Sequence, residues 1–261
     1  MKFDKKFTLL ILAAIILIII YLVFDKKSKD ETSNEILVVG VSPDYPPFEF
    51  IREGKVVGFD MDFAKALAKR MKKKVEVREM DFSALIPSLN SKKIDVVISA
   101  LSETPERAKK ISFSAPYYAS SFSLIIRIGS DFESLEEFLK NAKVGVQTGS
   151  TMEKFINYYK SVKDNDINVV SISSNFVLLE KLKIGEISAM VVEKPQAPEF
   201  VNNNPNLKYI VLPSEFPGNK GESYSIGVRK NSDLLNEINR VIDLLNTSHK
   251  MDKLLKKWNL N

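Results

Sequence analysis

The stretch ILVVGVSPDYPP, residues 36–47, decides the architecture, because it is a β-branched run that stops in a proline-rich loop. A helix is expected next, with Asp60 as its cap and apolar residues at helical spacing over residues 61–73. The alternation continues with a strand, a helix and a buried strand, at residues 75–80, 83–89 and 94–100. This order predicts an α/β fold with a parallel, doubly wound sheet, whose ligand loops lie at the carboxyl ends of the strands.

The same alternation begins again in the second half of the chain. Its strands and helices are expected at residues 142–147, 151–160, 169–172, 175–184 and 189–192. Two extended segments, 118–127 and 224–229, separate this unit from the first unit and from two C-terminal helices, at 233–245 and 250–258. The chain is therefore predicted to cross twice between two lobes, with a hinged ligand cleft between them. The expected division is 36–122 for the first part of lobe 1, 123–225 for lobe 2 and 226–261 for the return to lobe 1.

Residues 1–35 are expected to lie outside both lobes. Residues 7–24 form an uncharged, apolar stretch of 18 residues with lysines on both sides, which indicates an export signal. The stretch reaches the length of a spanning helix, and no Ala-x-Ala-like cleavage site follows it, so an uncleaved membrane anchor is favoured over a cleaved signal. Residues 25–35 are polar and predict a tether. The folded part then lies in the periplasm or another extracytoplasmic space.

Composition excludes several classes of function. The net charge is +5, and residues 36–261 carry 32 basic against 28 acidic residues, which is too mild and too mixed to indicate nucleic-acid binding. The chain has no cysteine, so a disulfide, a thiolate nucleophile, a cysteine-based zinc site and a lipid-carrying cysteine are excluded. His249 is the one histidine and stands among lysines, so a catalytic triad is not expected. No metal or cofactor is predicted.

The segment SALSETPER, residues 99–107, leaves a buried strand and enters a helix. Thr104 is a suitable N-cap and Pro105 a suitable first helical residue. Arg107 then has two interpretations. It either pairs with a surface carboxylate, or it presents its planar fork to an anion that the helix N-terminus already favours. A ligand carboxylate fits the second interpretation.

Two loops of the second unit are also candidates. In QTGSTME, residues 147–153, Ser150 and Glu153 have the spacing of a capping box, and Gly149 permits a close approach of the backbone. This helix N-terminus would face Arg107 from the opposite lobe and let one carboxylate bridge both lobes. Glu193 follows the last strand of the unit and is either a solvated loop residue or the partner of a cation.

At this point the chain resembles the amino-acid-binding family 3 extracellular solute-binding proteins of ABC importers. The motifs that carry the resemblance are DYPPFEF (44–50), GFDMD (58–62), MDFSALIP (80–87), SALSETPER (99–107), FSAPYY (113–118) and VGVQTG (144–149), with the Glu193 loop. They span residues 36–258. The resemblance implies a two-lobed binding protein that closes on a free amino acid and delivers it to a membrane permease. We expect it to act as a monomer and not as an enzyme.

The resemblance also implies a role for individual residues. The ligand carboxylate would be held by Arg107, Ser102, Ser150 and Thr151. The ligand ammonium would be held by Glu193 and the carbonyl of Ala100, while Tyr45 and Phe82 would pack on the ligand side chain; on their own, these two aromatic residues are more typical of a core.

Three positions depart from the family pattern. Asp is commoner in the place of Glu193, and Gly or Ser is commoner in the place of Ala100. Ser42 stands where binders of basic amino acids usually carry Asp. The sequence therefore favours a neutral or acidic polar ligand over lysine or arginine.

Two alternatives stay open at this point. Cyclohexadienyl dehydratases resemble these binders and use cleft carboxylates as acids, so an enzyme on the same scaffold is the first alternative. The expected ammonium site favours binding, because a prephenate-like substrate has no ammonium group. A membrane-anchored ligand sensor is the second alternative, and it would act through a separate partner.

Overall fold

The computed structural model describes residues 35–130, 132–163, 166–219 and 222–260. The predicted anchor, residues 7–24, lies outside the described residues. Within those that are described, no helix is both long and apolar enough to cross a bilayer. The strands are β1 Ile36–Val41, β2 Asp44–Tyr45, β3 Glu49–Arg52, β4 Lys55–Val57, β5 Lys74–Glu79, β6 Val96–Val97, β7 Ser112–Phe113, β8 Tyr118–Ser120, β9 Phe122–Arg127, β10 Lys143–Gln147, β11 Asn168–Ile172, β12 Ala189–Glu193, β13 Leu207–Val211, β14 Glu222–Tyr224 and β15 Gly227–Val228. The helices are α2 Phe59–Arg70, η1 Phe82–Ala84, α3 Leu85–Asn90, α4 Pro105–Ala108, α5 Leu135–Leu139, α6 Thr151–Lys163, α7 Asn175–Lys183, α8 Ala197–Val201, α9 Leu234–Thr247 and α10 Lys250–Lys257.

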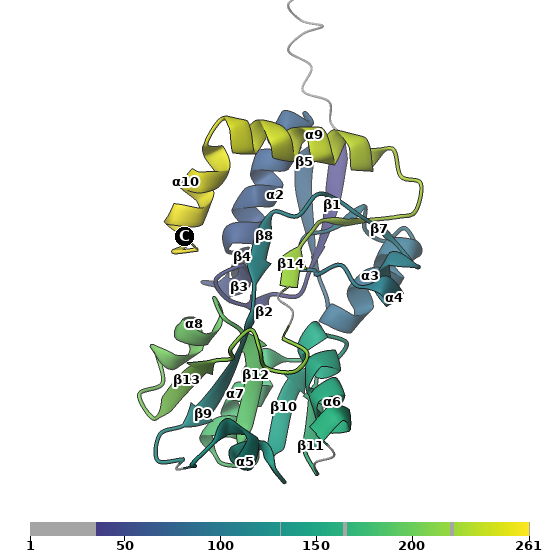
Figure 1. Cartoon of the computed structure of the whole chain (residues 1–261). Helices are drawn as coiled ribbons and strands as arrows, with labels where there is room; N and C mark the ends of the chain where they lie inside the picture. The colour runs from purple at the N-terminus through teal and green to yellow at the C-terminus, as the bar shows by residue number, and fades with distance from the viewer. Residues whose placement is uncertain (1–34, 131, 164–165, 220–221, 261) are drawn as a thin grey trace, which may run out of the picture.

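Two five-stranded sheets form the centres of two lobes (Figure 1). The first sheet has the order β5-β1-β6-β15-β7, and the second has the order β11-β10-β12-β9-β13. In each sheet the first three strands are parallel, as the alternation of strands and helices predicts. The predicted wholly parallel arrangement is wrong for the rest, because β15 and β9 pair antiparallel with both of their neighbours. Both strands enter their sheet from the other lobe, so they run away from the cleft.

The connections between the lobes run side by side. Strands β8 and β14 pair antiparallel with each other and lie between the two large sheets (Figure 1). Tyr224 of β14 also forms an isolated bridge with Ser102. The exact lobe boundaries, 122/123 and 225/226, stay predictions.

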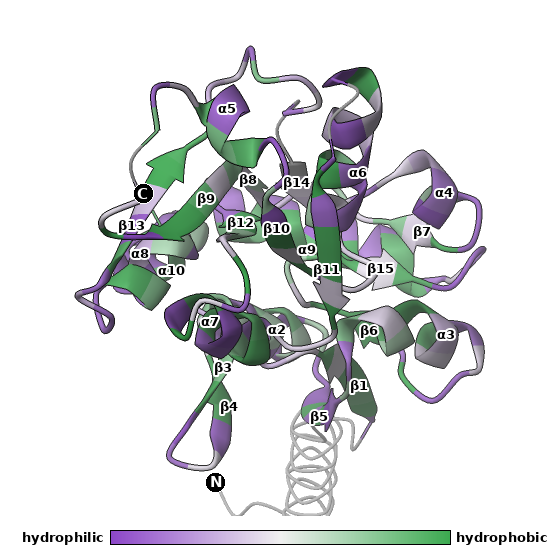
Figure 2. Ribbon diagram, turned by 90° about the horizontal axis from the view of Figure 1, so that it is seen from below, coloured by the Kyte–Doolittle hydropathy of each residue, from purple (hydrophilic) through white to green (hydrophobic). Residues whose placement is uncertain are grey.

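The C-terminal helices cover the first lobe. Helix α2 contacts both α9 and α10, and its buried side chains join one core with those of α9. Figure 2 shows mainly hydrophobic β1 and β9, whereas the helices alternate between hydrophilic and hydrophobic residues. This pattern is the one expected of sheets that are covered by amphipathic helices.

The start of α2 differs from the prediction. Gly58, not Asp60, occupies the N-cap, with a φ of 132°. A side chain there would collide with the backbone of Phe48, since a Cβ atom would lie 2.0 Å from its carbonyl oxygen. Asp60 is instead buried in the first turn, where its Oδ2 accepts hydrogen bonds from the Ala100 N–H (2.8 Å) and the Tyr117 hydroxyl (3.0 Å).

Two further elements differ from the prediction. The strand predicted at 94–100 is limited to β6, and Ala100 beyond it has a φ of 43°. The helix predicted at 83–89 begins as the short 3-10 turn η1 and becomes α-helical only at Leu85. Left-handed backbone interrupts strand pairing, and this places Ala100 in a loop above the sheet.

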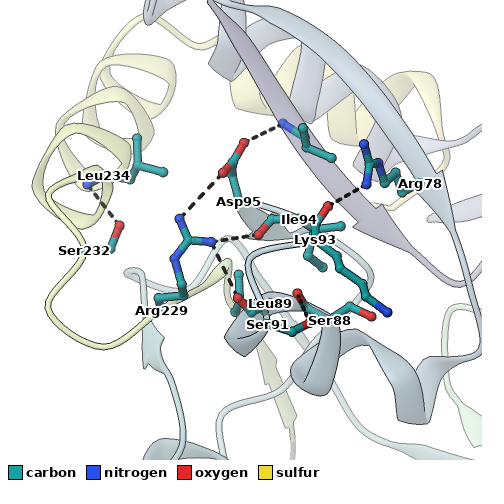
Figure 3. A network of polar contacts seen from close by, with 11 residues as sticks. Arg78, Ser88, Leu89, Ser91, Lys93, Ile94, Asp95, Arg229, Ser232 and Leu234 are labelled. Carbon is teal, nitrogen blue, oxygen red and sulfur yellow. Dashed lines mark hydrogen bonds and ion pairs between the residues drawn. The ribbon is translucent and has the colours of Figure 1, made fainter.

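The loop that precedes β6 is tied to β1, to β5 and to Arg229, which follows β15 (Figure 3). Arg229 donates to the carbonyl of Ile94 (2.8 Å) and lies 3.6 Å from Asp95. Asp95 accepts from the N–H of Val38 (3.0 Å), and Arg78 donates to the carbonyl of Lys93 (3.0 Å). These contacts fix this loop at the edge of the sheet that faces away from the second lobe.

Candidate ligand-binding site

A pocket lies between the two lobes. All eight residues that the sequence nominates line it, namely Tyr45, Phe82, Ala100, Ser102, Arg107, Ser150, Thr151 and Glu193. Six further residues complete the wall: Ser42, Asp44, Glu49, Ser99, Gln147 and Met152. The loops converge because they follow the carboxyl ends of parallel strands in both sheets, which is where open α/β sheets place their ligands.

Arg107 lies in the cavity wall and not on the surface, since it is only 7% exposed. The Thr104 hydroxyl caps α4 by accepting from the Arg107 N–H (3.2 Å), as predicted. The guanidinium donates to the carbonyl of Ser102 (2.7 Å) on its own side and to that of Gly149 (3.0 Å) on the other side of the cleft. Its carbon lies 5.2 Å from the centre of the Phe82 ring. The guanidinium is thus oriented by both lobes.

Helix α6 points its N-terminus at Arg107. The Ser150 hydroxyl accepts from the Glu153 N–H (3.1 Å), while the Glu153 carboxylate accepts from the Gly149 N–H (2.7 Å). The predicted capping box therefore forms with one change, because Glu153 bonds the residue before the cap. Gly149 has a φ of 76°, and a Cβ atom there would lie 3.4 Å from the side chain of Ser83. Glycine lets the two lobes approach each other here.

Glu193 ends β12 and is 2% exposed, so the solvated-loop interpretation is wrong. Its carboxylate accepts hydrogen bonds from the hydroxyls of Tyr45 and Tyr224. Burial and the Glu193 charge raise the pKa of both phenols well above the usual value, which keeps them neutral donors. A buried carboxylate that is held by neutral donors is suited to receive a cation.

Two carboxyl groups that sequence reasoning did not assign to the site stand beside Tyr45. Asp44 accepts from the Asn175 N–H (2.6 Å) and from the Gln147 amide (3.1 Å), both of which belong to the second lobe. The Ser42 hydroxyl also lies 3.4 Å from the Asp44 carboxylate. Burial raises the pKa of Asp44, and the hydrogen bonds from Asn175 and Gln147 oppose this effect.

Glu49 is the second of these groups and belongs to a buried polar chain. It accepts from the Ser99 hydroxyl (2.7 Å), which in turn accepts from the Ser42 N–H (3.0 Å). Burial, and then the charge of Asp60, raise the pKa of Glu49 well above its usual value. Burial raises the pKa of Asp60 to about 6, although hydrogen bonds from Ala100, Glu49 and Tyr117 oppose the rise. Glu49 therefore holds the proton of this pair of carboxyl groups.

A usable signal for the missed residues was present in the sequence. Asp44 begins β2, shortly after β1 ends, and Gln147 is the last residue of β10, so both stand near the carboxyl end of a strand, like the residues that were chosen. Glu49 begins β3, four residues after Tyr45. Ser99 and Met152 are neighbours of Ala100 and Thr151.

Comparisons with known proteins identify the family of this chain. The model of the family described as "Bacterial extracellular solute-binding proteins, family 3" matches residues 37–261. The arginine-binding extracellular protein ArtP of Bacillus subtilis is 34% identical over 257 residues, which cover 97% of this chain and 98% of that protein. The lysine/arginine/ornithine-binding periplasmic protein of Escherichia coli is 32% identical over 229 residues, which cover 86% and 87%.

Solved structures of arginine-binding proteins are also similar to this chain. An ancestral arginine-binding protein bound to arginine is 40% identical, with a TM-score of 0.79, and the match covers 86% of this chain and 98% of that one. The structure of an ancestral arginine-binding protein bound to glutamine is 37% identical, with a TM-score of 0.80 and coverage of 87% and 99%. The predicted two-lobed fold is thereby confirmed, and the chain belongs to family 3 of the bacterial extracellular solute-binding proteins.

Proposed function

We propose that this chain is the extracytoplasmic amino-acid-binding component of an ABC import system. Its two lobes close on a free amino acid and deliver it to a membrane permease. The observation that carries this proposal is the cavity between the lobes, where one arginine faces three carboxyl groups. The relatives described above are binding proteins, and their extracellular family supports an extracytoplasmic location.

The ligand carboxylate binds Arg107, with support from Ser102, Ser150 and Thr151. The guanidinium already bridges the lobes through carbonyl oxygens, and a carboxylate is a better acceptor for its planar fork. The ligand ammonium binds Glu193 and the carbonyl of Ala100. Because Arg107 and Glu193 come from opposite lobes, one amino acid that contacts both stabilises the closed form.

The ligand side chain carries a positive charge in this proposal. Once Arg107 has met the ligand carboxylate and Glu193 the ammonium, Asp44 and Glu49 remain in the cavity wall. Glu49 holds a proton and is neutral, so the charge that a ligand cation would compensate is that of the buried Asp44 carboxylate. This revises the expectation of a neutral or acidic ligand, which relied on Ser42. The carboxylate of Asp44 lies against the Ser42 hydroxyl and supplies the acid that position 42 lacks.

Arginine is the first candidate ligand, since both ArtP and the ancestral protein with arginine bound are arginine-binding proteins. We further propose that the protein is a monomer and that residues 7–24 keep it on the membrane.

A thermal-shift screen of the twenty amino acids tests this function on residues 30–261, which include every described element. A ligand at 100 times its dissociation constant should stabilise the fragment by about 2.7 kcal/mol. We expect the largest shift with arginine. Flat melting curves at millimolar concentrations of all twenty would reject amino-acid binding, and turnover of a prephenate-like substrate would then favour the dehydratase.

A further inference from the structure

One edge of the first sheet faces away from the cavity. Strands β1, β5 and β6 begin there, and β15 ends there, because β15 is antiparallel to β6. We call the loops at this place the far edge, and they comprise residues 71–74, 90–95 and 229–233. In Figure 1 the starts of β1 and β5 lie at the end of the molecule opposite the second lobe.

The far edge is strongly basic. It carries Lys72, Lys73, Lys74, Lys92, Lys93, Arg229 and Lys230. The acidic residues in or beside these loops are Glu35, Asp95 and Asp233. The neighbouring helix α9 adds two acidic residues, Glu237 and Asp243, and one basic residue, Arg240. Glu35 pairs with Lys73, and Asp95 lies against Arg229 (Figure 3). Lysines such as Lys92, Lys93 and Lys230 are exposed, so the far edge presents positive charge to the solvent.

The chain also reaches the folded part at this edge. The carbonyl of Glu35 accepts from the N–H of Lys74 (2.9 Å), and Ile36 is the register partner of Lys74. Only residues 25–34 stand between Glu35 and the apolar stretch 7–24. Ten residues span at most about 35 Å when extended and about 17 Å as a relaxed coil. An anchored chain would hold the far edge within that distance of the membrane.

We propose that the far edge is a docking surface for the anionic phospholipid headgroups of the membrane in which residues 7–24 are anchored. Headgroup phosphates match exposed lysines in charge, and clustered lysines next to a membrane segment are attracted to anionic surfaces. The short tether raises the effective concentration of the membrane surface at the far edge, and it does so at no other edge of the protein. The proposal rests on the anchored form of the proposed function. It implies that lobe 1 lies on the membrane while lobe 2 points away and remains free to move.

The full chain reconstituted into vesicles tests this proposal. Lysine acetylation would be followed by mass spectrometry in vesicles of phosphatidylcholine alone and in vesicles with one third phosphatidylglycerol. We expect Lys72, Lys92, Lys93 and Lys230, which are exposed, to react at least threefold more slowly on the anionic vesicles. Exposed Lys140 and Lys208 of the second lobe should react equally on both. The difference should disappear in 0.5 M NaCl, where screening acts over about 4 Å.

A variant with these four lysines changed to glutamine should lose protection at the remaining far-edge lysines, whereas K140Q/K208Q should keep it. Arginine binding in the same vesicles reports whether each variant folds. Equal acetylation on both vesicle types, with the chain retained after an alkaline carbonate wash, would overturn the docking surface and leave the anchor intact. Release of the chain by that wash would contradict the anchor and this proposal together. Protection of the far-edge lysines by soluble polyphosphate but not by phosphatidylglycerol would also overturn the phospholipid docking surface.

Discussion

The hydroxyl of Tyr45 donates a hydrogen bond to the carboxylate of Glu193 across the cleft between the two lobes. Tyr224, in the connection between the lobes, donates to the same carboxylate. The group that we assign to the ligand ammonium is therefore held by both the first lobe and the hinge. Any ligand that binds Glu193 acts on a contact that already joins the lobes, which couples binding to closure.

Removing one of these donors should weaken ligand binding. Tyr45→Phe keeps the aromatic wall but deletes the hydroxyl, and a hydrogen bond to a charged group contributes about 1.5–3 kcal/mol. We expect the dissociation constant for arginine to rise at least tenfold in calorimetry. Tyr158→Phe, on the exposed face of α6, serves as the control. Unchanged affinity in Tyr45→Phe would show that the phenol does not orient Glu193 in the bound state.

Charge selectivity should depend on Asp44. Asp44→Asn retains an acceptor for the Asn175 N–H but removes a negative charge from the cavity wall. Arginine affinity should fall tenfold or more, while glutamine affinity should change by less than threefold. Glu103→Gln is the matched control, since Glu103 is exposed and does not line the cavity. An equal loss for both ligands would assign Asp44 to lobe contact and not to recognition of the side chain.

Stability should fall as the pH rises from about 4 to 6. The pKa of Asp60 is about 6 in the folded state, above the value of about 3.9 expected in the unfolded chain. The folded state then binds more protons in this window, so the free energy of unfolding decreases with pH. Asp60→Asn cannot titrate and still offers an oxygen to the Ala100 N–H. We expect it to make the profile less steep and to be more stable than the parent at pH 7, while Glu49, whose pKa is also raised, retains part of the slope.

Urea unfolding at pH 4.5 and pH 7, without ligand, measures this effect. Asp243→Asn, on the exposed side of α9, should leave the parent profile unchanged. Parallel pH profiles for the parent and Asp60→Asn would show that Asp60 titrates normally in the folded protein.

The sequence predicts the order of strands and helices because local patterns determine them. The N-cap at Thr104, the capping pair Ser150 and Glu153, and the strand that ends at Glu193 are all local features. The antiparallel entry of β9 and β15 depends on a chain that crosses between lobes, and no local pattern records it. Asp60 was misassigned for the same reason, since its burial follows from contacts with Ala100 and Tyr117, 40 and 57 residues away.

The site was predictable where a residue type implies its chemistry. Arg107 and Glu193 follow strands in both units and were found in this way. Asp44 and Glu49 were not, because acidic residues near turns ordinarily face solvent. Their roles become apparent only once Asn175 and Ser99 close over them.

The membrane anchor makes a separate prediction. Because residues 7–24 have the length of a spanning helix and no small-residue cleavage site follows, the mature protein should stay in the membrane fraction with an intact N-terminus. N-terminal sequencing of protein from cells checks this. A sequence that begins between residues 25 and 35 would indicate a cleaved signal and a freely diffusing protein.

The effect of Arg107 on calorimetric affinity tests the central claim most directly. Arg107→Ala removes a charge-assisted pair from a closed cleft, which should cost roughly 2–5 kcal/mol, and Arg107→Lys should rescue binding only in part because it lacks the planar fork. Lys154→Ala is the control. Lys154 also reaches across the cleft and pairs with Glu106 (2.5 Å), but this pair is exposed to solvent. Exposed ion pairs contribute at most about 1 kcal/mol. Unliganded melting temperatures would confirm that each variant folds. We predict a loss of at least thirtyfold in arginine affinity for Arg107→Ala, and an affinity within threefold of the parent would contradict the assigned carboxylate site and the amino-acid ligand that depends on it.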